Sequence, residues 1–152
     1  MSANGVAALD LRAATLCNEA FRRVLDTSLS LQTAAMALLP GENTGVELHR
    51  DVEQRFYVHQ GTACFRFGEN AGRAPPDDVG VTRIDVGVGG YLRVPRGTHH
   101  YVECAANARE TLKLETCYSE VMHAPGTVHE RMADAAREKE FRHSVASAAG
   151  GT

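Results

Sequence analysis

Short segments in which hydrophobic and polar residues alternate run through the middle of the chain, separated by turns rich in glycine, proline and polar residues. Alternation with a period of two is typical of half-buried β-strands. Many short strands at regular spacing with Gly/Pro turns indicate a β-sandwich or barrel. The pattern predicts strands at residues 21–26, 29–39, 46–49, 55–60, 62–67, 81–86, 91–94, 100–104 and 112–118.

The two ends of the chain do not follow this alternation. We assign residues 1–20 to an N-terminal extension in which residues 10–14 allow one helical turn, and residues 21–122 to the barrel. In the following turn and helix, residues 123–143, Thr127-x-x-Glu130 matches a capping box and predicts a helix over residues 128–141. The small, polar residues 144–152 are expected to be disordered.

Candidate metal ligands begin in the stretch from Gly45 to Gly61. Residues two apart on a strand point to the same face, so Glu47 and His49 are expected to lie together. After a short polar turn, Gln54 shares a face with Phe56 and Val58. Two metal-capable side chains therefore enter from one strand and a third enters from the next.

A fourth candidate comes from residues 89–100, where the turn Pro95-x-Gly97 delivers His100 into a further strand. A mixed oxygen and nitrogen set of Glu47, His49, Gln54 and His100 suits Fe, Mn, Ni, Co or Zn. Octahedral geometry would leave two positions open for substrate or water, which metal catalysis requires.

These two stretches resemble the two motifs of the cupin family. The resemblance extends to the small single-domain cupins often described as mannose-6-phosphate-isomerase-like, and it covers roughly residues 20–136. It implies an all-β, double-stranded β-helix (cupin or jelly-roll) barrel with a short C-terminal helix, one divalent metal ion and a dimer. The supporting residues are Phe21-Arg22-Arg23-Val24-Leu25, Leu31-Gln32, Met36, Pro40-Gly41, Glu47-x-His49, Gln54, Tyr118 and His123-x-Pro125-Gly126-Thr127-Val128-His129.

The chain departs from the usual cupin pattern of three histidines and one glutamate at two positions. Glu47 stands at the first histidine position and Gln54 stands at the glutamate position. One anionic ligand therefore remains, but a neutral amide oxygen binds a cation more weakly than a carboxylate does. Glu53 could replace Gln54 only after a one-residue change of register, which would turn Phe56 outward.

Other polar residues have less certain roles. Tyr118 and His123 are our candidates for acid–base catalysis, although a place in the core is the default explanation for a tyrosine at position 118. His123 and His129 could close the barrel mouth, complete a dimer contact, or pack against or cap the C-terminal helix. His59 and His99 are expected to face outward because of their parity. Candidates for the pocket wall, each of which could instead belong to the core, are Gln32, Met36, Phe56, Val58, Cys104 and Thr116.

Composition narrows the classes of partner. The net charge of −3 and isoelectric point near 6.1 give no basic surface for nucleic acid or anionic membrane. Four scattered cysteines, no C-x-x-C pair and no signal-like N-terminus favour a cytoplasmic protein without disulfides. Exposed edges of the apolar N-terminal strands predict a homodimer.

Two classes of function follow from these features. In the first, which we favour, the chain is a metalloenzyme that binds a small polar metabolite at one divalent ion. It is either a sugar or sugar-phosphate isomerase, or an oxidoreductase that binds O₂ at Fe or Mn. In the second class the barrel only binds a metal ion or a small ligand. The apparent lack of a general base beyond the ligands, with Lys113 and Glu115 expected to face outward, weakens the isomerase hypothesis.

Overall fold

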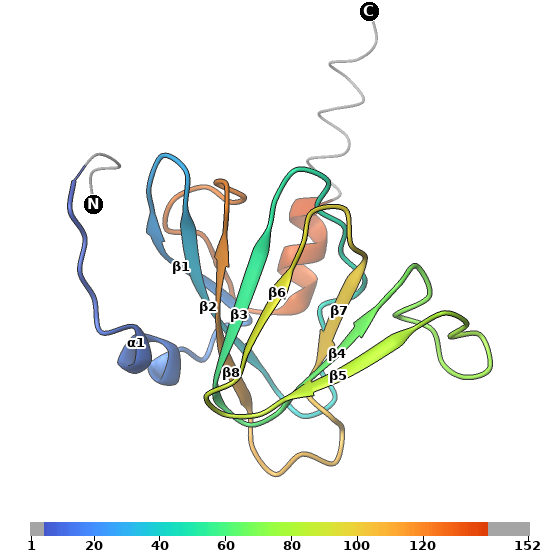
Figure 1. Cartoon of the computed structure of the whole chain (residues 1–152). Helices are drawn as coiled ribbons and strands as arrows, with labels where there is room; N and C mark the ends of the chain where they lie inside the picture. Colours follow the sequence, from blue (N-terminus) through green and yellow to red (C-terminus); the bar gives the residue numbers. More distant parts are fainter. Residues whose placement is uncertain (1–4, 140–152) are drawn as a thin grey trace, which may run out of the picture.

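The computed structural model describes residues 5–139, which form two antiparallel β-sheets that face each other (Figure 1). The six-stranded sheet has the order β6-β3-β8-β2-β1-β9, and the three-stranded sheet has the order β5-β4-β7. Their bounds, with that of the N-terminal helix, are α1 Leu11–Cys17, β1 Arg22–Thr27, β2 Gln32–Leu38, β3 Gln54–Gln60, β4 Ala63–Phe67, β5 Thr82–Val86, β6 Tyr91–Val94, β7 His100–Glu103, β8 Leu112–Tyr118 and β9 Val128–His129. The expected all-β jelly-roll barrel is confirmed.

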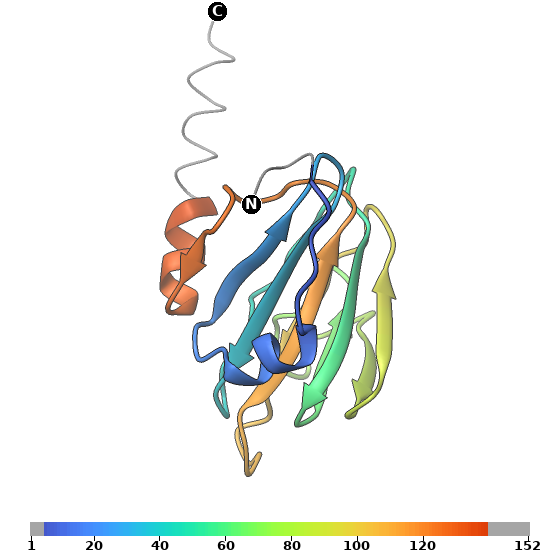
Figure 2. The same ribbon diagram turned by 90° about the vertical axis from the view of Figure 1, so that its left-hand side faces the viewer.

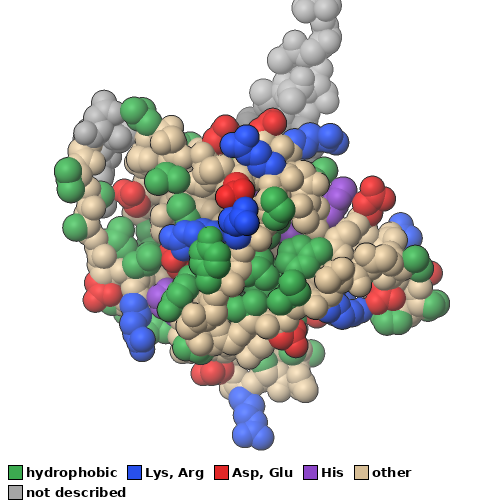
Figure 3. Space-filling model, in the orientation of Figure 1, with side chains coloured by type: hydrophobic (Ala, Val, Ile, Leu, Met, Phe, Trp, Pro, Cys, Tyr) green, Lys and Arg blue, Asp and Glu red, His purple; other side chains and the backbone are tan. Residues whose placement is uncertain are grey.

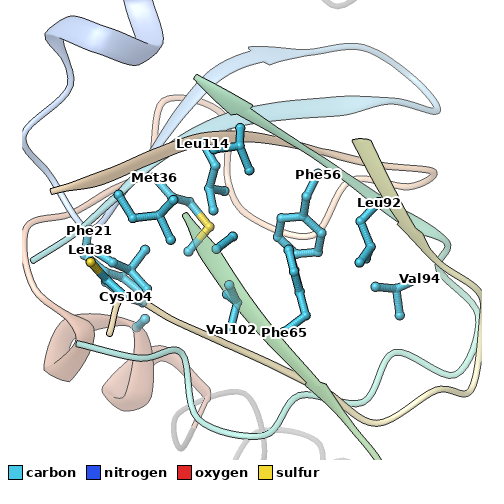
Figure 4. Close-up of a cluster of buried hydrophobic side chains, with 14 residues drawn as sticks. Phe21, Met36, Leu38, Phe56, Phe65, Leu92, Val94, Val102, Cys104 and Leu114 are labelled. Atoms are coloured by element: carbon cyan, nitrogen blue, oxygen red, sulfur yellow. The ribbon is translucent and has the colours of Figure 1, made fainter. Parts of the chain in front are cut away.

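The hydrophobic core fills the space between the two sheets. Side chains from both sheets converge there, as the labelled residues of Figure 4 show. Strand β3 shows why side chains from the sheet reach the core. Every second residue points inward, so Gln54, Phe56 and Val58 are buried while the residues between them are only partly buried. The same alternation that fills the core with Phe56 and Val58 thus turns the polar Gln54 inward at the start of the strand.

The outer face of the six-stranded sheet is covered in part by α1, which crosses it in Figure 2. Asp10 caps this helix by accepting a hydrogen bond from the Ala13 amide. Lys113 points outward, as its parity requires, but it is buried and donates hydrogen bonds to the Leu16 carbonyl and Glu19. Glu115 is likewise buried and pairs with Arg55 at 2.6 Å. Facing away from the barrel interior therefore does not expose these two side chains to solvent.

Two sequence predictions at the barrel mouth are wrong in detail. Residues 46–49 form no strand, because only Glu47 pairs with β7, through two backbone hydrogen bonds to His100. Val128 and His129 form β9 rather than the start of a helix, because the edge of β1 offers them backbone partners, with Arg22 opposite His129. The helix begins at residue 132, and the Asp134 carboxylate accepts from the Arg131 amide in place of the predicted capping box.

The edge of β1 is therefore not available to a second copy of the chain, since β9 covers it. Strand β6 lies at the opposite edge of that sheet, and its Tyr91 is exposed. In Figure 3, hydrophobic side chains gather in the middle of the visible face and charged side chains of both signs surround them. The homodimer remains a prediction. If it forms through a strand edge of this sheet, β1 is not the strand that pairs with the second copy, because β9 already covers β1.

Within residues 5–139, no helix is both long and apolar enough to span a lipid bilayer. The predicted disordered segment, residues 144–152, lies outside the described residues.

Candidate metal centre

The structure brings together Glu47, His49 and His100, whose potential ligand atoms all lie within 4.8 Å of one another. Glu47 Oε2 lies 3.8 Å from His49 Nε2 and 3.7 Å from His100 Nε2. Glu47 and His100 are held by the backbone bridge between them, and His49 is placed by a hydrogen bond from the Gly97 amide to its carbonyl. The three residues are almost fully enclosed, His49 being the most accessible at 13% exposure.

Hydrogen bonds orient the remaining candidate, Gln54, toward the same point. The Thr116 hydroxyl donates to the Arg55 carbonyl at 3.0 Å, so it accepts a hydrogen bond from the Gln54 amide nitrogen at 2.8 Å. Gln54 Oε1 then faces His100 Nε2 at 3.2 Å. This geometry adds an amide oxygen to the two imidazoles and the carboxylate.

The environment of His100 favours either a proton or a metal ion at the centre of this group. His100 Nδ1 lies 3.0 Å from the Thr98 carbonyl, which can only accept, so Nδ1 carries a proton and any lone pair of the ring is on Nε2, which points inward. Nε2 faces two acceptors, Gln54 Oε1 and Glu47 Oε2. A proton on Nε2 or a metal ion among the three atoms would make the arrangement favourable.

The distances suit a metal ion. Metal–ligand bonds of about 2.0–2.2 Å at ordinary bond angles separate two ligand atoms by roughly 3–3.5 Å. The observed separations of 3.2, 3.7 and 3.8 Å lie at or slightly above this range. His49 Nε2 is buried and has no hydrogen-bond partner, so a donor nitrogen is available. The residues present therefore fit a divalent ion.

Two cationic side chains that the sequence analysis did not identify stabilise the Glu47 carboxylate. Lys139, the last described residue of the C-terminal helix, donates to Glu47 Oε1 at 2.7 Å, and Arg22 Nη2 lies 3.6 Å from the same oxygen. Burial alone would raise the pKa of Glu47. The contacts with His100 and His49 and the charges of Arg22 and Lys139 overcome this effect and hold the pKa well below its usual value. The carboxylate is thus ionised and ready to bind a cation.

We expect this ionised carboxylate to stabilise the metal-free protein in a pH-dependent way. Because the pKa of Glu47 is lower in the folded state, its contribution is complete above the unfolded-state pKa near 4.5 and is lost as the pH falls through the folded-state value. Urea unfolding from about pH 7 to pH 3 should therefore show the advantage of wild type over Glu47→Gln shrinking in acid. A constant difference across this range would contradict the pKa assignment.

Arg22 could have been found by parity, since it shares the inward face of β1 with Val24 and an inward arginine requires a partner. Removing one partner of a buried ion pair leaves the other charge uncompensated. The Arg22→Met variant should therefore lose about 3 kcal/mol in the free energy of unfolding of the metal-free protein, measured by urea denaturation. Arg93→Met is the matched control, because Arg93 is 56% exposed in its pair with Glu53, and it should change stability by less than about 1 kcal/mol.

The ligand group lies against a pocket of about 430 Å³ at the barrel mouth. Its lining comes from the loop after residue 45, the inner face of the sheet and the C-terminal segment: Arg22, Val46, Glu47, Leu48, His49, Arg50, Tyr118, Met122, His123, Ala135, Glu138 and Lys139. Tyr118 and His123, our candidates for catalysis, are both on this wall. Their rings lie edge to face with centroids 5.7 Å apart, and the Tyr118 ring lies 6.2 Å from that of His49.

The six residues suggested for the pocket wall are placed elsewhere. Met36, Phe56, Val58 and Cys104 belong to the closed hydrophobic cluster, where van der Waals packing between the sheets leaves them no access to the pocket (Figure 4). Thr116 lies behind the site and holds Gln54. The remaining one, Gln32, is fully buried and binds the backbone of the segment that carries His123.

The two histidines expected to face outward lie away from the ligand group and are only partly exposed. The His59 ring lies tilted beside that of Tyr57, with centroids 4.9 Å apart, and burial lowers the pKa of His59. His99 immediately precedes His100, but its side chain is not on the pocket wall.

Comparison with known proteins identifies relatives whose functions are not described. The chain is 34% identical over 128 residues to the uncharacterized protein L612 of Acanthamoeba polyphaga mimivirus, an alignment that covers 84% of this chain and 74% of L612. It is 33% identical over 132 residues to the uncharacterized protein YrkC of Bacillus subtilis, covering 84% of this chain and 64% of YrkC. The chain thus spans just under two thirds of YrkC. No family model matches the chain.

Solved structures support the same architecture. The crystal structure of BH2720 from Bacillus halodurans superposes with a TM-score of 0.77 at 28% identity, covering 88% of this chain and 96% of that one. A cupin-2 domain protein from Shewanella frigidimarina superposes with a TM-score of 0.51 at 18% identity, covering 69% and 86% of the two chains. At 18% identity, the similarity to the Shewanella protein shows only that the two chains share a fold.

Proposed function

We propose that this chain, a cupin-fold protein that belongs to the same family as mimivirus L612, is a metalloenzyme that isomerises a small anionic metabolite. The cupin fold and the Glu47, His49 and His100 group support a metal-binding cupin. The observation that carries the enzyme proposal is that two residues of this group, Glu47 and His49, line a pocket, so that an ion held by the group could take a further ligand from the pocket. An open coordination position is the mark of a catalytic rather than a structural metal site.

In this proposal Glu47, His49, His100 and the Gln54 amide oxygen hold the divalent ion. When bound, such an ion acts as a Lewis acid that polarises a carbonyl or hydroxyl oxygen of the substrate. Thr98 and Thr116 keep His100 and Gln54 in the orientation that binding requires, through the hydrogen bonds described above.

The charges of the pocket favour an anionic substrate. Arg22, Arg50 and Lys139 line the pocket together with two carboxylates, those of Glu47 and Glu138. A divalent ion would make the pocket distinctly positive. Arg50 is exposed at the mouth and is the residue best placed to meet a carboxylate or phosphate group of an entering metabolite. Arg55, the other arginine of this region, is instead paired with Glu115 on the outer face of the sheet.

In this proposal Tyr118 and His123, the candidates from the sequence, supply the proton transfer that an isomerase needs. Burial raises the pKa of Tyr118, and the nearby charge of Arg22 only partly opposes this, so the phenol keeps its proton at neutral pH. It can donate a hydrogen bond to the substrate and give up its proton only to a strongly basic oxygen. The imidazole of His123 lies beside it in the pocket and can accept one. One group therefore gives a proton and its neighbour takes one, on the same wall.

Metal analysis combined with a turnover assay tests this proposal. Protein purified without added metal is expected to contain a divalent ion, and reconstituted protein should turn over a member of a panel of hydroxy and oxo acids and sugar phosphates. Oxygen consumption is followed in parallel. Turnover that requires O₂ and an Fe or Mn centre would replace the isomerase with an oxidoreductase, whereas a metal-loaded protein with no turnover would favour a binding module.

A further inference from the structure

A second group of metal-capable side chains lies on the same pocket wall, separate from the Glu47 centre. The potential ligand atoms of His123, His129 and Glu138 all lie within 4.8 Å of one another. The Glu138 carboxylate contacts both rings, with Oε1 3.4 Å from His123 Nδ1 and Oε2 against His129 Nε2. This group shares no residue with Glu47, His49 and His100.

The three side chains come from three different segments that tertiary contacts hold in place. His129 lies in β9, which pairs with β1. Glu138 lies on the C-terminal helix. His123 is fixed by Gln32, whose amide nitrogen donates to the His123 carbonyl at 2.8 Å and whose amide oxygen accepts from the His123 amide at 2.9 Å. A fully buried glutamine thus uses both ends of its amide to fix the backbone of this histidine, which limits the positions that its imidazole can take.

The chemistry of this set is that of a three-ligand transition-metal site. Two imidazoles and one carboxylate form the protein ligand set of several zinc enzymes, with water or substrate in the fourth position. His129 is 7% exposed, and its Nδ1 is buried without a hydrogen-bond partner, so hydrogen bonding does not use the full donor capacity of the ring. His123 and Glu138 line the pocket, which gives a bound ion access to small ligands.

From these observations we propose that His123, His129 and Glu138 bind a second divalent transition-metal ion, with Zn²⁺ or Co²⁺ as representative occupants. The ion would lie beside the pocket wall and, together with the ion at the Glu47 centre, give the pocket two metal positions. When it is bound, His123 serves as its ligand and not as the proton acceptor of the proposed function. The proposal does not depend on turnover, because it concerns binding alone.

Co²⁺ titration of the chelator-treated full-length protein tests this assignment, with the d–d absorption bands and the cobalt content after gel filtration as readouts. Wild type should bind two equivalents. His129→Gln and Glu138→Gln should each bind one, and so should Glu47→Ala/His49→Ala. His99→Ala is the matched control and should keep two equivalents.

The outcomes separate this inference from the proposed function. If His129→Gln and Glu138→Gln retain all the cobalt that wild type binds, the three residues form only a hydrogen-bonded network and the inference is wrong. Cobalt that is lost in these variants but kept in Glu47→Ala/His49→Ala would support the second site even if the Glu47 centre fails. Circular dichroism verifies that each variant folds. If His129→Gln, a change at a buried residue, does not fold, the cobalt content of Glu138→Gln tests the second site instead, since the Glu138 side chain is 24% exposed.

Discussion

The Glu47→Ala/His49→Ala variant is expected to lose the ion at the Glu47 centre and all metal-dependent turnover. The two substitutions remove the one anionic ligand and a histidine whose Nε2 has no other partner. His100 and the neutral Gln54 would remain, and two protein ligands are too few to hold a divalent ion against water. Elemental analysis after dialysis and steady-state kinetics on the substrate found in the metabolite panel measure the two losses.

Loss of the buried Glu47 charge also leaves Arg22 without one of its partners, so the variant needs a control for general damage. Glu110→Ala/His99→Ala removes the same two residue types outside the pocket, at an exposed glutamate and a partly buried histidine. This control should keep full metal content and full turnover. Full activity of Glu47→Ala/His49→Ala would end the metal-based mechanism.

Tyr118→Phe is expected to lower kcat by about 10³-fold while leaving the metal content unchanged, because general acid catalysis by a positioned side chain contributes about 10²–10⁴-fold. The phenol lies on the pocket wall between the rings of His49 and His123. The substitution removes only the hydroxyl, so the ring continues to fill the core.

A comparison of kcat with KM distinguishes proton donation from packing. Loss of a proton donor lowers kcat and kcat/KM together, whereas a distorted pocket also raises KM. Tyr101→Phe is the matched control: Tyr101 is also buried and donates to Glu103 at 2.9 Å, away from the pocket wall. An unchanged kcat in Tyr118→Phe would assign this tyrosine to the core.

Strand parity was sufficient to predict most of the Glu47 centre. Alternation placed Gln54 inward with Phe56 and Val58, and the Pro-Gly turn brought His100 opposite Glu47, as the backbone bridge between these residues shows. The prediction of a strand at residues 46–49 was wrong, yet the convergence of Glu47 and His49 persisted. One bridge to β7 and one hydrogen bond from Gly97 are enough to hold the segment.

The C-terminal segment shows what local patterns cannot supply. Thr127-x-x-Glu130 satisfies the rule for a helix cap, but Val128 and His129 gain more by pairing with β1, a partner more than 100 positions earlier in the chain. For the same reason, nothing near Glu138 or Lys139 in the sequence indicates that the helix returns to the barrel mouth. Long-range contacts decide both cases, and a single sequence does not encode them as a periodicity.

The pairing of Arg22 with His129 has a consequence for how the protein can evolve. These two paired residues have different roles: Arg22 is a counter-ion of Glu47, and His129 is a ligand of the second proposed site. A shift of β9 by a single residue would turn the His129 side chain to the opposite face and disturb the strand that carries Arg22. Insertions between β8 and β9 must therefore be accommodated in the intervening loop. Homologues should vary in the length of this loop while keeping the pairing of Arg22 with His129.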